Sequence, residues 1–314
     1  MGRAFLFPGQ GSQAVGMGRE LGQAMAAARE VFEEVDEALQ QHLSRLMFEG
    51  PESELLLTEN AQPALFAVSL AVARVLEREG GFRLADKAVF VAGHSLGEYS
   101  ALAAAGALSI SDGARLLKLR GRTMQQAVPL GEGAMAALLG CELDVAAEVA
   151  LEATKEGSVC AVANDNGPGQ VVISGYRQGV ERAIELFRAK GGRRSIMLPV
   201  SAPFHCPLMQ PAADAMAEAL KGTEIRAPAP PVIANVTARE TDDPEQIRKL
   251  LVEQVTAMVR WRETVLYLKE RNVDKLVEVG AGYVLSGLAK RISPDFALGA
   301  VHTPADVEAF FKSL

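Results

Sequence analysis

The segment Ala88-Val89-Phe90-Val91-Ala92-Gly93-His94-Ser95-Leu96-Gly97 joins an unbroken apolar run to a G-x-S-x-G motif. Such an apolar run is typical of a central strand of a parallel sheet, which is buried on both faces. The alanine-rich residues after Leu96 predict a helix. A strand, a sharp turn and a helix form a nucleophile elbow, in which flanking glycines avoid Cβ clashes and the serine oxygen stands clear of the backbone. The motif predicts Ser95 as a nucleophile; the alternative is a tight Gly-Ser turn without chemistry.

Strands and helices alternate on both sides of this segment. Residues Arg3–Phe7 predict a short buried strand, and a helix is expected to begin at Gln62-Pro63, with the proline at the first helical position. Later elements are predicted as a strand at 232–235, helices near 244–256 and 261–271, a strand at 275–279 and a helix after Gly282. This alternation predicts an α/β fold built on a parallel sheet.

The order of elements changes between Gly133 and Pro199. Strands are predicted there at 134–139, 159–163, 170–174 and 195–198, and helices at 144–154 and 178–190. The resulting β-α-β-β-α-β order is the signature of a ferredoxin-like unit. We therefore predict a large α/β domain formed by residues 1–130 and 199–314, with a small ferredoxin-like subdomain inserted at residues 131–198.

A serine nucleophile needs a base, and the chain has four histidines. His94 is adjacent to Ser95, but neighbouring side chains at the end of a strand point to opposite faces. His205 lies in Ser201-Ala202-Pro203-Phe204-His205-Cys206-Pro207, which two prolines stiffen. A rigid loop around a titratable group favours a catalytic role. The alternative for His205 is a buried structural histidine.

Arg120 is expected to point inward. The residues Asp112–Val128 predict an amphipathic helix on which Leu117, Met124 and Val128 share the face of Arg120, at spacings of 3, 4 and 8 residues. A buried guanidinium must be paired, because an isolated buried charge is very costly. Its partner is either a protein carboxylate, with Glu98 as a candidate, or the carboxylate of a ligand, which arginine can clamp with two parallel hydrogen bonds.

Composition excludes several classes of function. The 314 residues include 32 Lys and Arg against 39 Asp and Glu, a net charge of −7, which argues against general binding to nucleic acid or anionic membranes. No apolar stretch is long enough to span a membrane. Three cysteines without metal-like spacing fit a cytoplasmic protein.

The sequence contains no motif for a bound nucleotide. Gly9-x-Gly11 lacks the third glycine of a dinucleotide fingerprint, and no P-loop is present. We therefore expect no tightly held cofactor and no metal.

Several motifs together resemble one enzyme family over nearly the whole chain. They are, in order, Phe7-Pro8-Gly9-Gln10-Gly11-Ser12-Gln13, Gly93-His94-Ser95-Leu96-Gly97-Glu98-Tyr99, Arg120-Gly121-Arg122, Val162-Ala163-Asn164, Pro203-Phe204-His205 and Glu253-Gln254-Val255-Thr256. Their order and spacing are similar to those of malonyl-CoA:acyl carrier protein transacylases. The resemblance implies a hydrolase-like α/β domain carrying a ferredoxin-like subdomain, in agreement with the pattern of elements.

The resemblance also implies a role for each matching position. Ser95 would be the nucleophile, His205 the base, and the main-chain carbonyl of Gln254 would orient the histidine. Backbone N–H groups of Gln10 and Leu96 would form the oxyanion hole. Four residues would contact the substrate: Arg120, which would hold the malonyl carboxylate, Phe204, which would crowd a branched acyl group, Met124 and Asn164.

The implied reaction passes malonyl from malonyl-CoA to the pantetheine thiol of acyl carrier protein in two half-reactions, through an ester on Ser95, and so supplies extender units for fatty acid synthesis. Two other classes stay open on the residues alone. An esterase or thioesterase would need Ser95 and His205, but would gain nothing from an inward Arg120. An inactive acyl-binding protein would not need both the nucleophile and the base.

Overall fold

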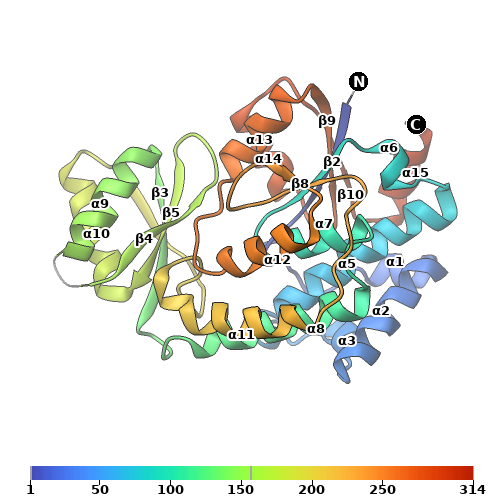
Figure 1. The fold of residues 1–314 in the computed structure, drawn as a ribbon, viewed down its shortest axis with the longest axis horizontal. Helices are drawn as coiled ribbons and strands as arrows, with labels where there is room; N and C mark the ends of the chain where they lie inside the picture. Colours follow the sequence, from blue (N-terminus) through green and yellow to red (C-terminus); the bar gives the residue numbers. More distant parts are fainter. Residues whose placement is uncertain (1, 156–157, 314) are drawn as a thin grey trace.

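A computed structural model describes residues 2–155 and 158–313. Figure 1 shows a larger α/β part and, on its left, a smaller lobe built on a second sheet. The larger sheet has the strand order β10-β9-β1-β2-β7-β8. Its strands are β1 (Gly2–Phe7), β2 (Phe90–Gly93), β7 (Val232–Ile233), β8 (Glu240–Thr241), β9 (Val273–Val279) and β10 (Ala297–Val301). All neighbouring pairs are parallel except β7 and β8.

Helices enclose this sheet on both faces. They are α1 (Arg19–Ala24), α2 (Ala26–Leu39), α3 (Leu43–Glu49), α4 (Glu52–Leu55), α5 (Thr58–Gly80), α6 (Leu84–Lys87), α7 (Gly97–Ala104), α8 (Ile110–Gln126), the 3₁₀ turn η1 (Pro207–Met209), α11 (Gln210–Lys221), α12 (Pro244–Glu253), α13 (Trp261–Glu270), α14 (Val284–Ile292) and α15 (Pro304–Lys312). None of the helices in the described ranges is long and apolar enough to cross a membrane.

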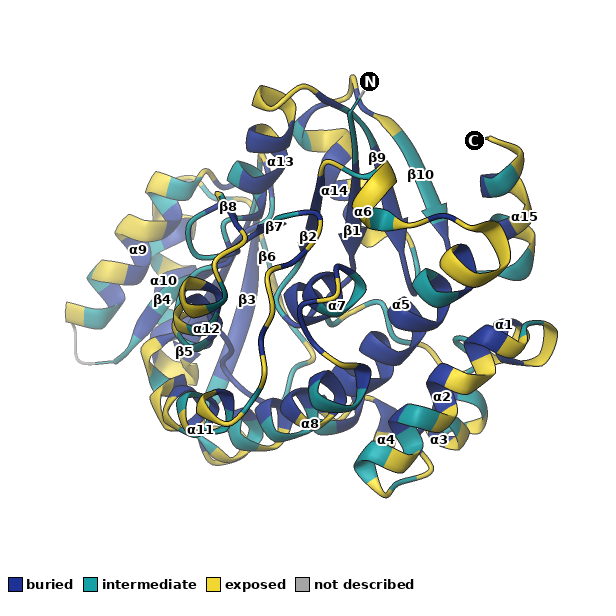
Figure 2. Cartoon of the chain, turned by 45° about the vertical axis from the view of Figure 1, so that its right-hand side comes forward, coloured by how far each residue is buried: buried dark blue, intermediate teal, exposed yellow. Residues whose placement is uncertain are grey.

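The two faces of β1 support two separate cores. Phe5 and Phe7 belong to a cluster with α2, α5, α7 and α8, whereas Ala4 and Leu6 belong to a cluster with α13 and α14. This division follows from the alternation of side chains along a strand. Strand β2, the second half of β1 and much of α5 are dark blue in the burial view (Figure 2). Burial on both faces of the sheet accounts for the continuous apolar sequence of β2 and of the second half of β1.

Several predicted boundaries differ from the structure by a few residues: the strand at 232–235 ends at Ile233, the helix at 244–256 ends at Glu253, and the helix at 112–128 runs from Ile110 to Gln126. Two further differences lie close to the elbow. The strand of the elbow is Phe90–Gly93 and not residues 88–92, because Val89 lies at the surface with 42% of its area exposed. The helix expected to begin at Gln62 begins at Thr58, so that Pro63 lies inside α5. Thr58, Asn60 and Ala61 in the first turn of α5 are buried, so packing against the rest of the protein, and not the position of the proline, determines where the helix begins.

The second sheet is antiparallel, with the order β4-β5-β3-β6. Its elements are β3 (Gly133–Leu139), α9 (Leu143–Lys155), β4 (Cys160–Asp165), β5 (Gln170–Tyr176), α10 (Arg177–Ala189) and β6 (Arg194–Met197). The fold class predicted from the sequence, an α/β domain with a ferredoxin-like βαββαβ unit, is confirmed. These elements fall inside the segment 131–198 that we propose as the subdomain.

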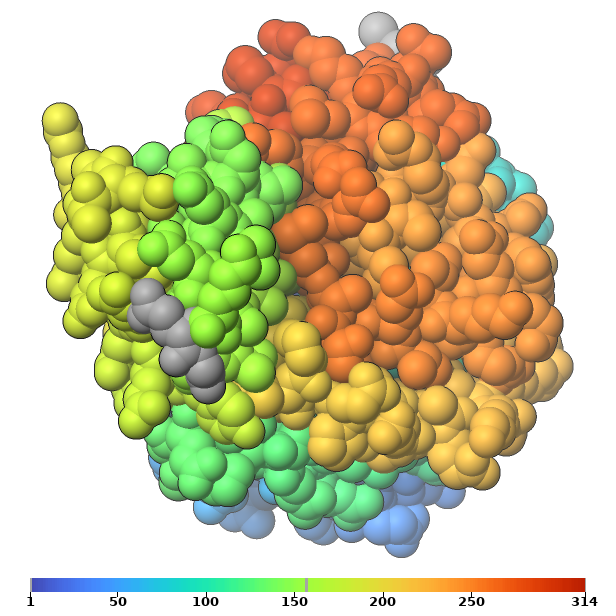
Figure 3. Space-filling view, turned by 60° about the vertical axis from the view of Figure 1, so that its left-hand side comes forward, coloured from blue at the N-terminus to red at the C-terminus, as the bar shows by residue number. Residues whose placement is uncertain are grey.

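The smaller lobe lies directly against C-terminal residues of the larger part. In the space-filling view its green residues lie against orange ones (Figure 3). The main chain joins the two parts: Asn164 of β4 forms a parallel bridge with Val259, and the N–H of Asp165 donates to the carbonyl of Val259 over 3.0 Å. The end of β4 is thereby fixed beside the C-terminal ends of the parallel strands, where α/β proteins place their sites.

Candidate active site

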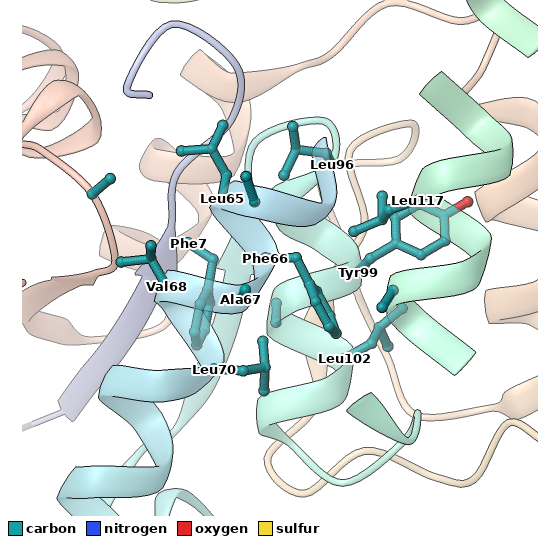
Figure 4. Close-up of a cluster of buried hydrophobic side chains, with 14 of the residues drawn as sticks. Phe7, Leu65, Phe66, Ala67, Val68, Leu70, Leu96, Tyr99, Leu102 and Leu117 are labelled. Atoms are coloured by element: carbon teal, nitrogen blue, oxygen red, sulfur yellow. The ribbon is translucent and has the colours of Figure 1, made fainter. Parts of the chain in front are cut away.

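The turn between β2 and α7 carries Ser95 in a left-handed conformation, with φ of 55°. Neither flanking glycine can be replaced. A Cβ on Gly93 would lie 1.9 Å from the carbonyl carbon of Gly97, and a Cβ on Gly97 would lie 2.2 Å from the carbonyl oxygen of Phe7. Leu96 and Tyr99, which follow the serine, are packed among side chains of α5 and α8 (Figure 4). The turn therefore has the geometry of a nucleophile elbow.

Asn235, just after β7, spans this turn. Its Oδ1 accepts a hydrogen bond from the backbone N–H of Ser95 over 2.7 Å, and its Nδ2 donates to the carbonyl of Gly93 over 2.6 Å. Asn235 is fully buried, so both bonds are shielded from water. An amide offers a donor and an acceptor on one plane, which matches the two backbone groups of the turn.

His205 lies opposite the serine. Its Nε2 is 2.7 Å from Oγ of Ser95, and its Nδ1 is 2.9 Å from the main-chain carbonyl oxygen of Gln254. Because a carbonyl oxygen only accepts, Nδ1 carries the hydrogen and the lone pair of Nε2 faces the serine hydroxyl. Burial, with a smaller effect from the positive charge of Arg120, lowers the pKa of His205 to about 3. The imidazole is therefore neutral at pH 7 and able to take a proton.

Arg120 reaches the same point from α8. Its side chain is buried, with Nη1 donating to Oε1 of Gln62 over 2.8 Å and Nη2 donating to Oε1 of Gln254 over 2.9 Å. Nη2 also lies 3.2 Å from Oγ of Ser95. The inward orientation expected from the helix spacing is observed.

A carboxylate partner for Arg120 is not present within the described residues, whose ion pairs do not include Arg120 with Glu98. Nε of Arg120 has no hydrogen-bond partner in that part of the chain either. Glu98 is itself buried, and burial raises the pKa of its carboxyl to about 7. Two glutamine amides therefore hold a guanidinium that still has N–H groups to offer to an anion.

A pocket of about 420 Å³ opens in front of these groups. It brings together most of the residues that the sequence singled out, and its lining includes Gln10, Ser95, Leu96, Arg120, Asn164, Phe204 and His205. Met124 does not line it: this side chain is fully buried behind Gln62, whose Nε2 lies 3.8 Å from the Met124 sulfur. Gln254 contributes to the site through its carbonyl and its buried amide.

The backbone N–H groups of Gln10 and Leu96 are available for a ligand. Neither donates a hydrogen bond to another residue in the described ranges. The loop that carries Gln10 is anchored by its side chain, whose Oε1 accepts from the hydroxyl of Thr58 over 3.0 Å. Two free N–H groups beside a nucleophile are what an oxyanion requires.

Five polar residues of the site were not predicted as part of it: Gln13, Gln62, His94, Asn166 and Asn235. His94 lines the pocket, with Nε2 2.8 Å from Oδ1 of Asn166, and burial lowers its pKa. The Asn and Gln residues among them follow no periodic pattern, so the sequence does not indicate that their side chains belong to the site. Within the described ranges, no group of three or more His, Cys, Asp or Glu residues could hold a metal ion.

Comparison with known proteins agrees with this geometry. The acyl transferase domain family matches residues 4–290. The malonyl CoA-acyl carrier protein transacylase of Bacillus subtilis is 46% identical over 311 residues, which cover 99% of this chain and 96% of that protein. The enzyme of that name from Escherichia coli K12 is 44% identical over 306 residues, which cover 98% of this chain and 97% of that protein.

Two solved structures of related enzymes match this chain over its full length. The acyl-carrier-protein S-malonyltransferase of Bartonella henselae is 53% identical and superposes with a TM-score of 0.97, covering 100% of this chain and 99% of that one. A malonyl-transacylase solved in complex with a type II polyketide synthase acyl carrier protein is 41% identical, with a TM-score of 0.96 and 100% of both chains covered. The elbow serine, its histidine and the buried arginine thus occur in a chain that belongs to the malonyl CoA-acyl carrier protein transacylase family of acyl transferases.

Proposed function

We propose that this chain transfers the malonyl group of malonyl-CoA to the pantetheine thiol of acyl carrier protein, through an ester on Ser95, in the cytoplasm and for fatty acid synthesis. One observation carries the proposal: Oγ of Ser95 lies 2.7 Å from Nε2 of His205 and 3.2 Å from Nη2 of Arg120. A nucleophile between a base and a fixed cation suits an acyl group that ends in a carboxylate.

In the first half-reaction, Oγ of Ser95 attacks the thioester carbonyl while its proton passes to Nε2 of His205. The backbone N–H groups of Gln10 and Leu96 stabilise the oxyanion. The C–S bond then breaks, the coenzyme A thiol leaves with the proton from His205, and malonyl remains on Ser95 as an ester. The carbonyl of Gln254 keeps the ring in the tautomer that both proton transfers need.

The second half-reaction reverses these steps with a different thiol. His205, neutral again, takes the proton of the pantetheine thiol as its sulfur attacks the serine ester. The ester C–O bond breaks and His205 returns the proton to Oγ of Ser95. A thiol is acidic enough, at a pKa of about 8.5, to leave or attack without a strongly basic histidine. This accords with a histidine oriented by a carbonyl in place of a carboxylate.

Arg120, Asn164 and Phe204 would select the acyl group. Arg120 would bind the malonyl carboxylate, and Phe204, buried beside the base, would leave little room for a branch at the α-carbon. A hydrolase would use the same Ser95 and His205, but a buried guanidinium beside the nucleophile would give it no advantage. The activity for which the relatives are named also favours transfer to acyl carrier protein.

The test uses malonyl-CoA labelled in its acyl group. Without acceptor, the label should remain on the protein, and a peptide map should place it on Ser95. Added acyl carrier protein bearing pantetheine should take the label at a rate well above that of free malonate release. Fast release of malonate with or without the carrier would identify a thioesterase, and absence of any labelled ester would identify an inactive binding protein.

A further inference from the structure

The side-chain amide of Gln254 lies between the buried guanidinium of Arg120 and the buried carboxyl group of Glu98. Its Oε1 accepts from Nη2 of Arg120 over 2.9 Å, and its Nε2 donates to Oε2 of Glu98 over 2.7 Å. The same Nε2 lies 3.1 Å from the carbonyl oxygen of Ser95. Glu98, in the first turn of α7, is 1% exposed, and Arg120 is equally buried, so water does not compete for these bonds.

The two charged groups determine which way the amide points. A guanidinium has only donors and a carboxylate has only acceptors. Rotating the Gln254 amide by half a turn would set its NH₂ against the guanidinium and its oxygen against the carboxylate, so that both ends would lose their bonds. Leaving such buried groups unpaired is costly, and only one orientation is therefore populated.

Glu98 is itself fixed by the backbone. Its Oε2 accepts from the backbone N–H of Asn235 over 3.0 Å, and Asn235 is the residue whose side chain spans the elbow. Asn235 is anchored in turn by its carbonyl, which accepts from the N–H of Arg260 over 3.1 Å. The chain of contacts therefore runs from the main chain after β7, through Glu98 and the Gln254 amide, to the guanidinium.

We propose that Glu98 is a positioning residue for substrate selection: it orients the Gln254 amide so that Oε1 holds Nη2 of Arg120 beside Ser95, where the guanidinium meets the carboxylate of the acyl group. This inference rests on the proposed function. Glu98 touches neither the substrate nor the reacting atoms and acts through Gln254. Its loss should therefore reduce the preference for malonyl over an acyl group without a carboxylate.

The readout is the ratio of the single-turnover rates at which malonyl-CoA and acetyl-CoA acylate Ser95. Glu98→Met removes the acceptor in a side chain of similar length, and should lower this ratio by about 10-fold or more, as expected for coupled buried groups. Glu98→Gln keeps an oxygen for both donors and should hold the ratio within about threefold of the wild type. In an Arg120→Ala background, Glu98→Met should change the ratio no further.

Glu278→Gln is the matched control. Glu278 is also a buried glutamate, and it accepts from the backbone N–H groups of Leu285 and Ser286 without lining the pocket. This variant should lose stability and leave the ratio unchanged. If Glu98→Met fails to fold, Glu98→Asp tests the same contact, because its shorter chain draws the carboxylate away from Gln254.

Two results would overturn the inference: an unchanged ratio in a folded Glu98→Met or Glu98→Asp protein, or the same loss of ratio from Glu98→Gln as from Glu98→Met. Failure of the proposed function would look different, because the wild-type protein would then not transfer malonyl to acyl carrier protein at all.

Discussion

Ser95 and His205, whose Oγ and Nε2 atoms are 2.7 Å apart, both have a left-handed backbone, with φ of 55° and 57°. Neither is glycine or asparagine, the residues that tolerate this conformation best, and each costs about 1–2 kcal/mol relative to an ordinary backbone. Packing around the elbow and the Asn235 bonds hold the serine in this conformation. Stability has thus been given up at the two residues that make the central contact of the site.

Replacement of Ser95 by glycine should therefore stabilise the protein relative to replacement by alanine. Both variants lose the hydroxyl and should form no acyl-enzyme, but alanine keeps the strained Cβ. We expect Ser95→Gly to be more stable than Ser95→Ala by about 1 kcal/mol. At Ser100, inside α7, the order should reverse, with glycine less stable by about 0.5–1 kcal/mol. Urea denaturation measures both differences, and the same order at the two positions would contradict the strain.

The pH dependence of acylation should show no histidine titration near 6.5. Burial lowers the pKa of His205 to about 3, so the base is neutral throughout the range above about pH 5 and is lost only at lower pH. The positive charge of Arg120 contributes to the lowering. A carboxylate bound to Arg120 offsets that charge, so the pKa governing kcat should lie above the pKa governing kcat/KM.

Stopped-flow acylation with malonyl-CoA between pH 3 and 8, started by a rapid pH jump from neutral enzyme and followed at low and saturating substrate, measures both profiles. Glu98, which is buried beside the site, also titrates in this range, since burial raises its pKa to about 7. Any inflection near neutrality should therefore disappear in Glu98→Gln. An inflection near 6.5 that persists in this variant would assign an ordinary pKa to His205.

The sequence predicted those parts of the site that depend on local pattern. The elbow follows from an apolar run that leads into a serine flanked by two glycines, and the inward Arg120 follows from helical spacing. The element order of the smaller lobe was also clear, because each helix and strand there is longer than a full period. The strand predicted at 232–235 is only two residues long, Val232–Ile233 (β7), and the hairpin that it forms with the equally short β8 was not predicted.

Contacts between distant uncharged residues could not be predicted in this way. The bond from Asn235 to Ser95 spans 140 residues, and the bond from Arg120 to Gln254 spans 134. Asn and Gln lie mostly at the surface of proteins, so nothing in the sequence marks the few that are buried in a site. The prediction that Arg120 needs a carboxylate partner missed a third solution, in which amides hold the cation until an anion arrives.

The packing at Gly93 should make this position intolerant of any side chain. Gly93→Ala places a methyl group 1.9 Å from the carbonyl carbon of Gly97, and neither backbone can yield without breaking the elbow. We expect loss of acylation and a destabilisation of more than about 3 kcal/mol. Gly287, inside α14, has no atom within 4 Å of its added Cβ, so Gly287→Ala should stabilise by about 0.5–1 kcal/mol. Thermal unfolding and acylation rates of the pair test this contrast.

Positive charge near the pocket rim should attract an acidic carrier protein. Arg193, Arg194, Lys290 and Arg291 are exposed, and none forms an ion pair within residues 2–155 and 158–313, whereas Lys190 is already paired with Glu148 over 2.8 Å. Arg194 lies in register with Leu139, which pairs with Gln170 at the turn that carries Asn166. Ile292, next to Arg291, contacts the same turn at Gly167. Both clusters therefore lie on the side of the molecule where the turn carrying Asn166, a residue of the pocket lining, is found.

Charge reversal of each pair should raise the KM for acyl carrier protein, more strongly at low salt, and leave the KM for malonyl-CoA unchanged. Arg45→Glu on α3 changes the net charge away from the pocket and is the control. Unchanged carrier kinetics in both reversed pairs would exclude these surfaces.

Removal of Arg120 should change the choice of acyl group. Arg120→Ala deletes a cation that no carboxylate balances by direct contact, so the fold should survive. Malonyl transfer should fall by about 10- to 100-fold, since a charge-assisted hydrogen bond contributes about 1.5–3 kcal/mol. Acetyl transfer should hold steady or rise, because the pocket no longer favours an anion. Arg120→Lys should restore malonyl transfer only in part, because an ammonium lacks the planar pair of donors. Competition between the two labelled thioesters, with acyl carrier protein as acceptor, measures the ratio directly, and an equal loss for both would make Arg120 a structural residue.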